Sequence, residues 1–172
     1  MKNALIYVDN IVKSLSTLVP EEKSFFKAQG ESYKKKIRAL FNEIKDEMST
    51  VSLENRKVLT NHDAFQYLGH DFHIYFFSPL GMSTEAEASA KTVVTLIEKI
   101  RDRGIHAIFV EKTLNPRLIQ QIAKETGTHV AGSLYSDALD VPGTDAGTYL
   151  GMMKFNLYAL VKALQTPRES KD

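Results

Sequence analysis

The chain has 172 residues, and its 22 Lys and Arg nearly balance its 21 Asp and Glu. A charge this close to neutral gives no general attraction to nucleic acid or anionic lipid, so we expect no nucleic-acid partner. The sequence contains no Cys, which excludes both a disulfide and a thiolate metal site. No apolar run approaches the roughly 18 residues that a transmembrane helix needs.

The first ten residues, MKNALIYVDN, lack the apolar core and small-residue cleavage site of a secretory signal. We therefore expect that the chain as written carries no export signal. The absence of Cys fits the cytosol, but exported proteins need not carry disulfides, so composition leaves the compartment open.

The first third of the sequence predicts two helices. In residues 3–19, apolar side chains recur at helical spacing: Leu5, Val8, Val12, Leu15 and Leu18. Pro20 and the two acids after it suit the first turn of a second helix. From there to about Met48 only Gly30 interrupts the pattern, which predicts a rod of about 42 Å. We treat residues 1–50 as a helical segment dominated by this long helix.

Beyond residue 50 the sequence predicts an α/β lobe over residues 51–172. Short apolar and aromatic runs predict four strands, at 57–60, 73–78, 106–111 and 129–136. Amphipathic segments predict four helices, at 63–72, 86–104, 115–127 and 146–165. This alternation is typical of a parallel sheet with right-handed crossovers. We therefore expect a four-stranded parallel sheet flanked by helices.

One polar side chain follows each predicted strand: His62, Ser78, Glu111 and Asp137. The carboxyl ends of parallel strands meet at one edge of the sheet, where α/β proteins bind ligands. Four polar groups at one edge exceed what helix capping needs. The pattern therefore makes this edge the candidate site.

Several of these residues have simpler explanations. Asp63 could cap a helix that begins at Ala64. Glu111 could pair with Lys112 or Arg117. Asp137 could close the turn before Val141. His62 has the weakest structural explanation, because an imidazole at a strand end gains little from capping. The other four histidines are assigned surface or packing roles: His70, His73, His106 and His129.

Motifs for common enzymes are absent from the sequence. There is no G-x-S-x-G, no G-x-x-x-x-G-K-[ST], no G-x-G-x-x-G and no H-E-x-x-H. We therefore expect no enzymatic activity. An imidazole with a carboxylate suits zinc, and mixed nitrogen and oxygen ligands also suit manganese. Two protein ligands are too few for a tight site.

Four segments carry a family resemblance: VLTNHDAFQYLGHDF, GMSTEAEASAK, AIFVEKTLNPRLIQQIAKETG and GSLYSDALDVPGTDAGTYLGMMKFNLYALVKAL. In order and spacing, from about residue 2 to 165, the chain resembles the C-terminal half of the cluster 9 (ZnuA-like) metal-binding solute-binding proteins. These are the zinc and manganese receptors of bacterial ABC importers. The resemblance implies two α/β lobes joined by a long helix, with four side chains holding a metal between the lobes. It assigns the third ligand to His62 and the fourth to Asp137.

The chain departs from that family in lacking the first two histidine ligands. They belong to an N-terminal lobe, the second within an Asp-Pro-His-x-Trp motif that this sequence does not contain. The resemblance thus implies a C-terminal-lobe fragment of a periplasmic receptor that delivers metal to a membrane permease. We expect Zn²⁺, with Mn²⁺ as the alternative, because nitrogen donors favour zinc. Binding by the fragment should be weak or absent, with Glu111 or solvent completing the ligand shell.

A second interpretation is a stand-alone α/β interaction or regulatory domain in which His62 and Asp137 are structural. For the fragment we also expect self-association through the N-terminal helices. Separation from a second lobe would uncover apolar stripes on both helices. These stripes comprise Leu5, Val8, Val12 and Leu15 on the first helix, and Phe26, Tyr33, Ile37, Leu40 and Ile44 on the second.

Overall fold

A computed structural model describes residues 1–80, 90–105 and 107–166. Its chain divides into two compact units, Met1–Asp46 and Glu47–Asp172, which are described separately. Three parts of the sequence expectations lie outside the described residues: His106, the 86–89 start of one predicted helix, and residues 167–172 of the predicted lobe.

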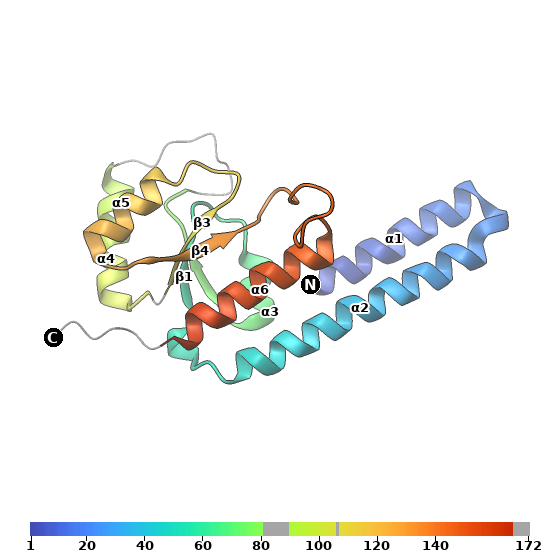
Figure 1. Cartoon of the computed structure of the whole chain (residues 1–172), viewed down its shortest axis with the longest axis horizontal. Helices are drawn as coiled ribbons and strands as arrows, with labels where there is room; N and C mark the ends of the chain where they lie inside the picture. The colour runs from blue at the N-terminus through green and yellow to red at the C-terminus, as the bar shows by residue number, and fades with distance from the viewer. Residues whose placement is uncertain (81–89, 106, 167–172) are drawn as a thin grey trace. The chain divides into compact units, whose positions relative to one another are not determined.

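The first unit is a pair of antiparallel helices (Figure 1). Helix α1 spans Lys2–Leu18, a single 3₁₀ turn spans Pro20–Glu22, and α2 spans Lys23–Ser49, continuing past the unit boundary. The helices approach closely at Gly30, where a Cβ would lie 2.5 Å from Val12 Cγ2. Lys34 of α2 pairs with Asp9 of α1, and the hydrogen bonds that Lys34 donates to Asp9 and, secondly, to Glu31 raise the pKa of the lysine.

Helix α1 has two apolar stripes. Leu5, Val8 and Val12 are half-buried, and the two valines face Gly30 of α2. A second stripe is exposed and comprises Tyr7, Ile11, Leu15 and Leu18. Leu15 thus lies with the exposed stripe, and the uncovered face of α1 differs from the one that the sequence pattern indicated.

The second unit contains the predicted four-stranded sheet. Its strands are β1 (Lys57–Leu59), β2 (Tyr75–Phe77), β3 (Ala107–Glu111) and β4 (Val130–Leu134). They lie in the order β2-β1-β3-β4, and every neighbouring pair is parallel. The prediction of a parallel sheet is confirmed, with strands shorter than the apolar runs that predicted them.

Helices cover both faces of this sheet. They are α3 (Gln66–Phe72), α4 (Ala90–Arg103), α5 (Arg117–Thr126) and α6 (Tyr149–Gln165); a 3₁₀ turn at Leu53–Asn55 precedes β1. Figure 1 shows α4 and α5 on one side of the sheet and α3 and α6 on the other. On the first side, Leu59 and Ile108 pack with apolar residues of both helices, including Ile97 and Ile122.

The strand order places a switch point between β1 and β3. From β1 the chain passes outward to β2, then crosses back to β3 on the other side of β1. The two connections leave β1 in opposite directions, and in α/β sheets ligands bind beyond the carboxyl ends of the strands at such a point, here β1 and β3. His62 follows the first of these strands and Glu111 ends the second.

None of the helices in the described part of the chain has the length and apolar character to cross a membrane.

Candidate metal site

His62 is held by the turn that follows β1. The side chain is 3% exposed. Its backbone carbonyl accepts hydrogen bonds from the Ala64 N–H at 3.0 Å and the Thr60 hydroxyl at 3.1 Å. These contacts fix the backbone of a residue that no regular element contains, so the imidazole has a defined place beside the sheet.

Glu111, the last residue of β3, lies directly behind His62. Its side chain is 0% exposed, and both carboxylate oxygens face the histidine. One oxygen accepts the His62 backbone N–H at 2.9 Å, and the other lies 2.7 Å from His62 Nδ1. A carboxylate in this position favours a proton on Nδ1.

Asn61 ties the same two strand ends together. Its side-chain oxygen accepts the Glu111 backbone N–H at 2.9 Å, and its amide group donates to the Asn115 carbonyl at 3.2 Å. Asn61 and His62 therefore make reciprocal bonds with Glu111, one to its backbone and one to its side chain. The switch point is rigidly bonded across β1 and β3.

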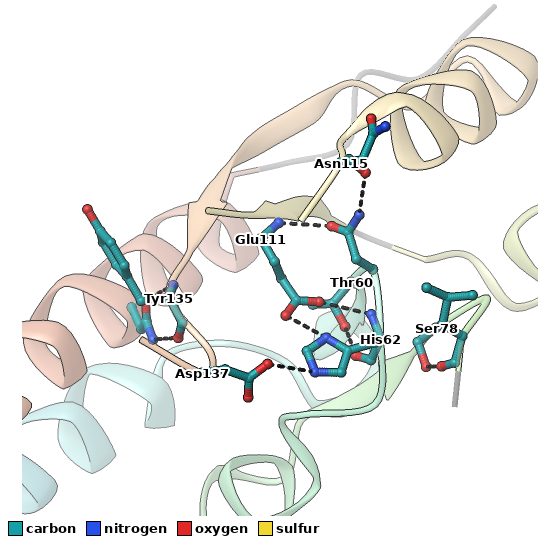
Figure 2. Close-up of polar contacts among 10 residues, drawn as sticks. Thr60, His62, Ser78, Glu111, Asn115, Tyr135 and Asp137 are labelled. Carbon is teal, nitrogen blue, oxygen red and sulfur yellow. Dashed lines mark hydrogen bonds and ion pairs between the residues drawn. The ribbon is translucent and has the colours of Figure 1, made fainter. Parts of the chain in front are cut away.

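Asp137 approaches from the loop after β4. Its Oδ2 lies 3.3 Å from His62 Nε2, and its side chain is 64% exposed. Figure 2 shows the imidazole between the two carboxylates, with Glu111 on one side and Asp137 on the other. The site is thus buried on the Glu111 side and open to solvent on the Asp137 side.

The loop that carries Asp137 is anchored at Tyr135. Asn156 of α6 accepts the Tyr135 N–H at 2.9 Å and donates to the Tyr135 carbonyl at 2.7 Å. The Tyr135 hydroxyl donates to Asp140 Oδ2 at 2.6 Å. This bond raises the pKa of Tyr135 and is the main cause of the lowered pKa of Asp140.

The simpler roles considered from the sequence do not match the contacts found. Helix α3 begins at Gln66 without a side-chain cap, and Asp63 bonds the Gln66 side chain instead. The contacts found for the Glu111 carboxylate go to His62 rather than to Lys112 or Arg117. At the turn before Val141 the side chain that accepts its N–H is that of Asp140.

Three of the four predicted strand-end residues come together, and one does not. Ser78 donates to the Leu80 carbonyl at 2.8 Å, a local turn contact away from the histidine (Figure 2). Within residues 1–80, 90–105 and 107–166, no three His, Asp or Glu side chains converge in a geometry that could hold a metal ion. The described residues therefore offer His62 and Asp137 as two candidate ligands, with Glu111 turned toward the histidine.

The sequence pattern did not indicate the roles of Asn61 and Asn156. A signal existed for Asn156, which interrupts the apolar face of the last helix between Met153 and Leu157. A buried amide on such a face needs partners, but the sequence does not say which. Its partner is 21 residues earlier in the chain.

The parallel sheet, its switch point and the His–Asp pair define a class: α/β proteins that bind a ligand at the carboxyl edge of the sheet. The sequence model of one protein family, described as zinc-uptake complex component A, periplasmic (ZnuA), matches residues 1–163 of this chain. The chain belongs to this family.

Relatives agree with the family assignment. The chain is 31% identical over 163 residues to the manganese-binding lipoprotein MntA of Bacillus subtilis, covering 92% of this chain and 53% of the relative. It is 27% identical over 164 residues to the metal ABC transporter substrate-binding lipoprotein SloC of Streptococcus mutans, covering 95% and 54%. The chain thus spans about half the length of the curated relatives it matches.

Solved structures share the fold. A manganese-bound periplasmic metal binding protein from Candidatus Liberibacter asiaticus superposes with a TM-score of 0.85 at 30% identity, covering 95% of this chain and 60% of that one. The periplasmic zinc binding protein TroA from Treponema pallidum gives 0.86 at 28% identity, covering 91% and 58%. The predicted resemblance to zinc and manganese solute-binding proteins is confirmed.

Proposed function

We propose that this chain is the C-terminal lobe of a metal receptor that supplies Zn²⁺, or alternatively Mn²⁺, to an ABC importer. His62 and Asp137 are its metal ligands, and a second lobe supplies the others. The receptor works outside the cytoplasmic membrane and passes its cargo to a permease. The names of its relatives, which include periplasmic and lipoprotein metal binders, support this assignment.

The observation that carries the proposal is the 3.3 Å separation between His62 Nε2 and Asp137 Oδ2. A charge-assisted hydrogen bond between these atoms would be shorter, about 2.7–2.9 Å. Two ligands that each bind zinc at about 2.1 Å in tetrahedral geometry lie about 3.4 Å apart. The pair is therefore spaced like one edge of a zinc coordination shell.

Glu111 acts in this proposal as the support for His62 rather than as a ligand. Its two oxygens already face the His62 backbone N–H and Nδ1. Metal-bound histidines commonly donate their second ring N–H to a carboxylate in this manner. The ligand shell of the lobe then contains one imidazole and one carboxylate, and the imidazole favours zinc.

Binding by this chain alone should be weak, because zinc sites need four ligands, or three with a water. Titration calorimetry at neutral pH should show no tight one-to-one zinc complex with the monomer. His62→Ala and Asp137→Ala should each weaken the residual binding, measured by competition with a weak chelator. Ser78→Ala is the matched control, since it lies at the same sheet edge but bonds only locally in the described structure.

The competing assignment is an interaction or regulatory domain in which the His–Asp pair is structural. It predicts that His62→Ala lowers the free energy of unfolding while zinc and manganese affinities stay at the wild-type value. Equal metal affinity in wild type and both ligand variants would establish that assignment and reject ours.

We also propose that the isolated chain self-associates through α1. Tyr7, Ile11 and Leu18 are 64%, 58% and 75% exposed along one side of that helix. An apolar stripe of this length is unusual on a soluble monomer. Pairing two copies would cover it.

A further inference from the structure

We infer that Asn156 is a positioning residue for the metal-binding carboxylate of Asp137. The inference rests on the proposed function, because it assumes that Asp137 is a ligand. Asn156 lies on α6, is 2% exposed and touches neither His62 nor Asp137 in the contacts described above. It acts through the backbone of Tyr135, two residues before the ligand.

The need for such a residue follows from where the sheet ends. The last pairing of β4 is between Leu134 and Glu111, and the Leu134 carbonyl accepts the Lys112 N–H at 3.0 Å. Beyond this point no strand of the described residues pairs with the backbone N–H and C=O of Tyr135. Asn156 supplies an acceptor at 2.9 Å and a donor at 2.7 Å, as a neighbouring strand would.

The Asp137 side chain cannot fix its own position by packing, because it is 64% exposed. Its distance from His62 Nε2 is therefore set by the backbone that presents it. That backbone leaves the sheet at Tyr135, which α6 holds from one side through Asn156. On the other side the Tyr135 hydroxyl is bonded to Asp140, so the residues between the two anchors have little freedom.

The two candidate ligands are thus supported in parallel ways. Glu111 of β3 lies directly against the ring of His62, and Asn156 of α6 bonds the chain that carries Asp137. A displacement of the Asp137 carboxylate by about 1 Å would change its distance from His62 Nε2, and the two atoms would no longer be spaced to bind one metal ion. Asn156 consequently controls affinity without touching the metal.

The test compares Asn156→Asp and Asn156→Leu with wild type. Asn156→Asp keeps an acceptor for the Tyr135 N–H but places an oxygen against the Tyr135 carbonyl. Asn156→Leu removes both hydrogen bonds. The matched control is Leu164→Ala, which opens a cavity at a fully buried position two turns further along α6.

The first readout needs no metal. In the wild-type chain, ¹⁵N relaxation should give Ser136 and Asp137 backbone order parameters of about 0.85, typical of rigid backbone. Asn156→Asp should lower them below about 0.6 while β1 and β3 stay rigid. In Leu164→Ala the order parameters of Ser136 and Asp137 should stay at the wild-type values, even if this variant is destabilised as much as Asn156→Asp.

The second readout is zinc affinity from chemical-shift titration, with Asp137→Asn as an additional arm. Asn156→Asp should lose at least about tenfold in affinity, as removal of an outer-shell support does. Leu164→Ala should change affinity by less than about twofold, because packing far from the site is independent of it.

Three results would overturn the inference. Wild-type rigidity at Ser136 and Asp137 in both Asn156 variants would show that the loop does not depend on Asn156. An equal loss of affinity in Leu164→Ala would make the effect one of general stability. Wild-type zinc affinity in Asp137→Asn would refute the proposed ligand itself, which the relaxation data distinguish from failure of the positioning role.

Discussion

At the residue scale, the site depends on which nitrogen of His62 carries a proton. The Glu111 carboxylate spans the His62 backbone N–H and Nδ1, and its side chain is fully buried. A proton on Nδ1 makes Nε2 a donor of electrons to a metal. On the buried side of the site, Glu111 therefore favours the His62 tautomer that has its proton on Nδ1.

Glu111→Gln should reverse this tautomer. The backbone N–H of His62 can only donate, so the glutamine oxygen must stay opposite it. The glutamine NH₂ group then faces Nδ1, which must accept, and the ring proton moves to Nε2. We expect a zinc affinity at least about tenfold lower with little change in stability. Imidazole ¹⁵N shifts report the tautomer directly; an Nδ1–H tautomer in the variant would contradict this account of Glu111.

The Tyr135–Asp140 bond predicts a pH-dependent stability. The bond lowers the pKa of Asp140 from its ordinary 3.8, so the folded state favours the ionised form. Its stabilisation is fully present above the unfolded pKa and is lost as pH falls through the lower folded value. Tyr135→Phe should therefore be less stable than wild type at pH 7, and the difference should shrink in acid below about pH 3.8.

Denaturant unfolding at a series of pH values measures this difference. Tyr67→Phe is the control, since Tyr67 is 77% exposed and should show no such trend. A difference between wild type and Tyr135→Phe that stays constant from pH 7 into strong acid would remove Asp140 from the explanation.

At the element scale, the sequence predicted the elements well and their side-chain partners poorly. Alternating apolar runs and amphipathic segments were sufficient for the four strands and the helices between them, because burial imposes those periods. The carboxyl ends of parallel strands meet at one edge of the sheet, and this principle was sufficient to predict that His62, Glu111 and Asp137 lie together. The same principle also predicted that Ser78 lies in the site, because it does not specify the direction in which a side chain turns. The roles of Asn61 and Asn156 could not be predicted from the sequence, because their hydrogen-bond partners are distant in the chain.

The α1–α2 pair offers a test of packing within the first unit. Alanine is favoured over glycine inside a helix by about 1 kcal/mol. At Gly30, however, a Cβ would lie 2.5 Å from Val12 Cγ2, and a β-branched valine has few other rotamers in a helix. Gly30→Ala should therefore reduce amide hydrogen-exchange protection in α1. Combining it with Val12→Ala should restore protection to at least that of Val12→Ala alone; increased protection in the single variant would contradict the close approach.

At the scale of the whole molecule, the chain is one half of what its relatives contain. It spans 53–54% of MntA and SloC, and its described residues provide two candidate metal ligands facing each other. A site divided between two lobes would explain why neither a third ligand nor a closed metal cavity is needed in this one. The same division would account for the exposed stripe on α1.

Self-association through that stripe can be tested by sedimentation over a concentration series. Tyr7→Glu with Ile11→Glu should convert an associating chain into a monomer, because two charges would have to be buried in the interface. Lys13→Gln with Thr17→Glu changes the net charge by the same amount at exposed positions of α1 that are not helical neighbours of Tyr7 or Ile11, and should associate like wild type. A wild-type chain that is monomeric at every concentration would end the proposal.

The most direct measurement of the central claim, that His62 and Asp137 hold the metal, is residue-resolved NMR of this chain with substoichiometric Mn²⁺. A paramagnetic ion broadens nearby signals most, so weak binding is sufficient to locate it. Our account predicts that His62 and Asp137 broaden first, that added Zn²⁺ reverses the effect, and that His62→Ala abolishes it. Broadening centred on other exposed carboxylates, and unchanged in His62→Ala, would contradict the account.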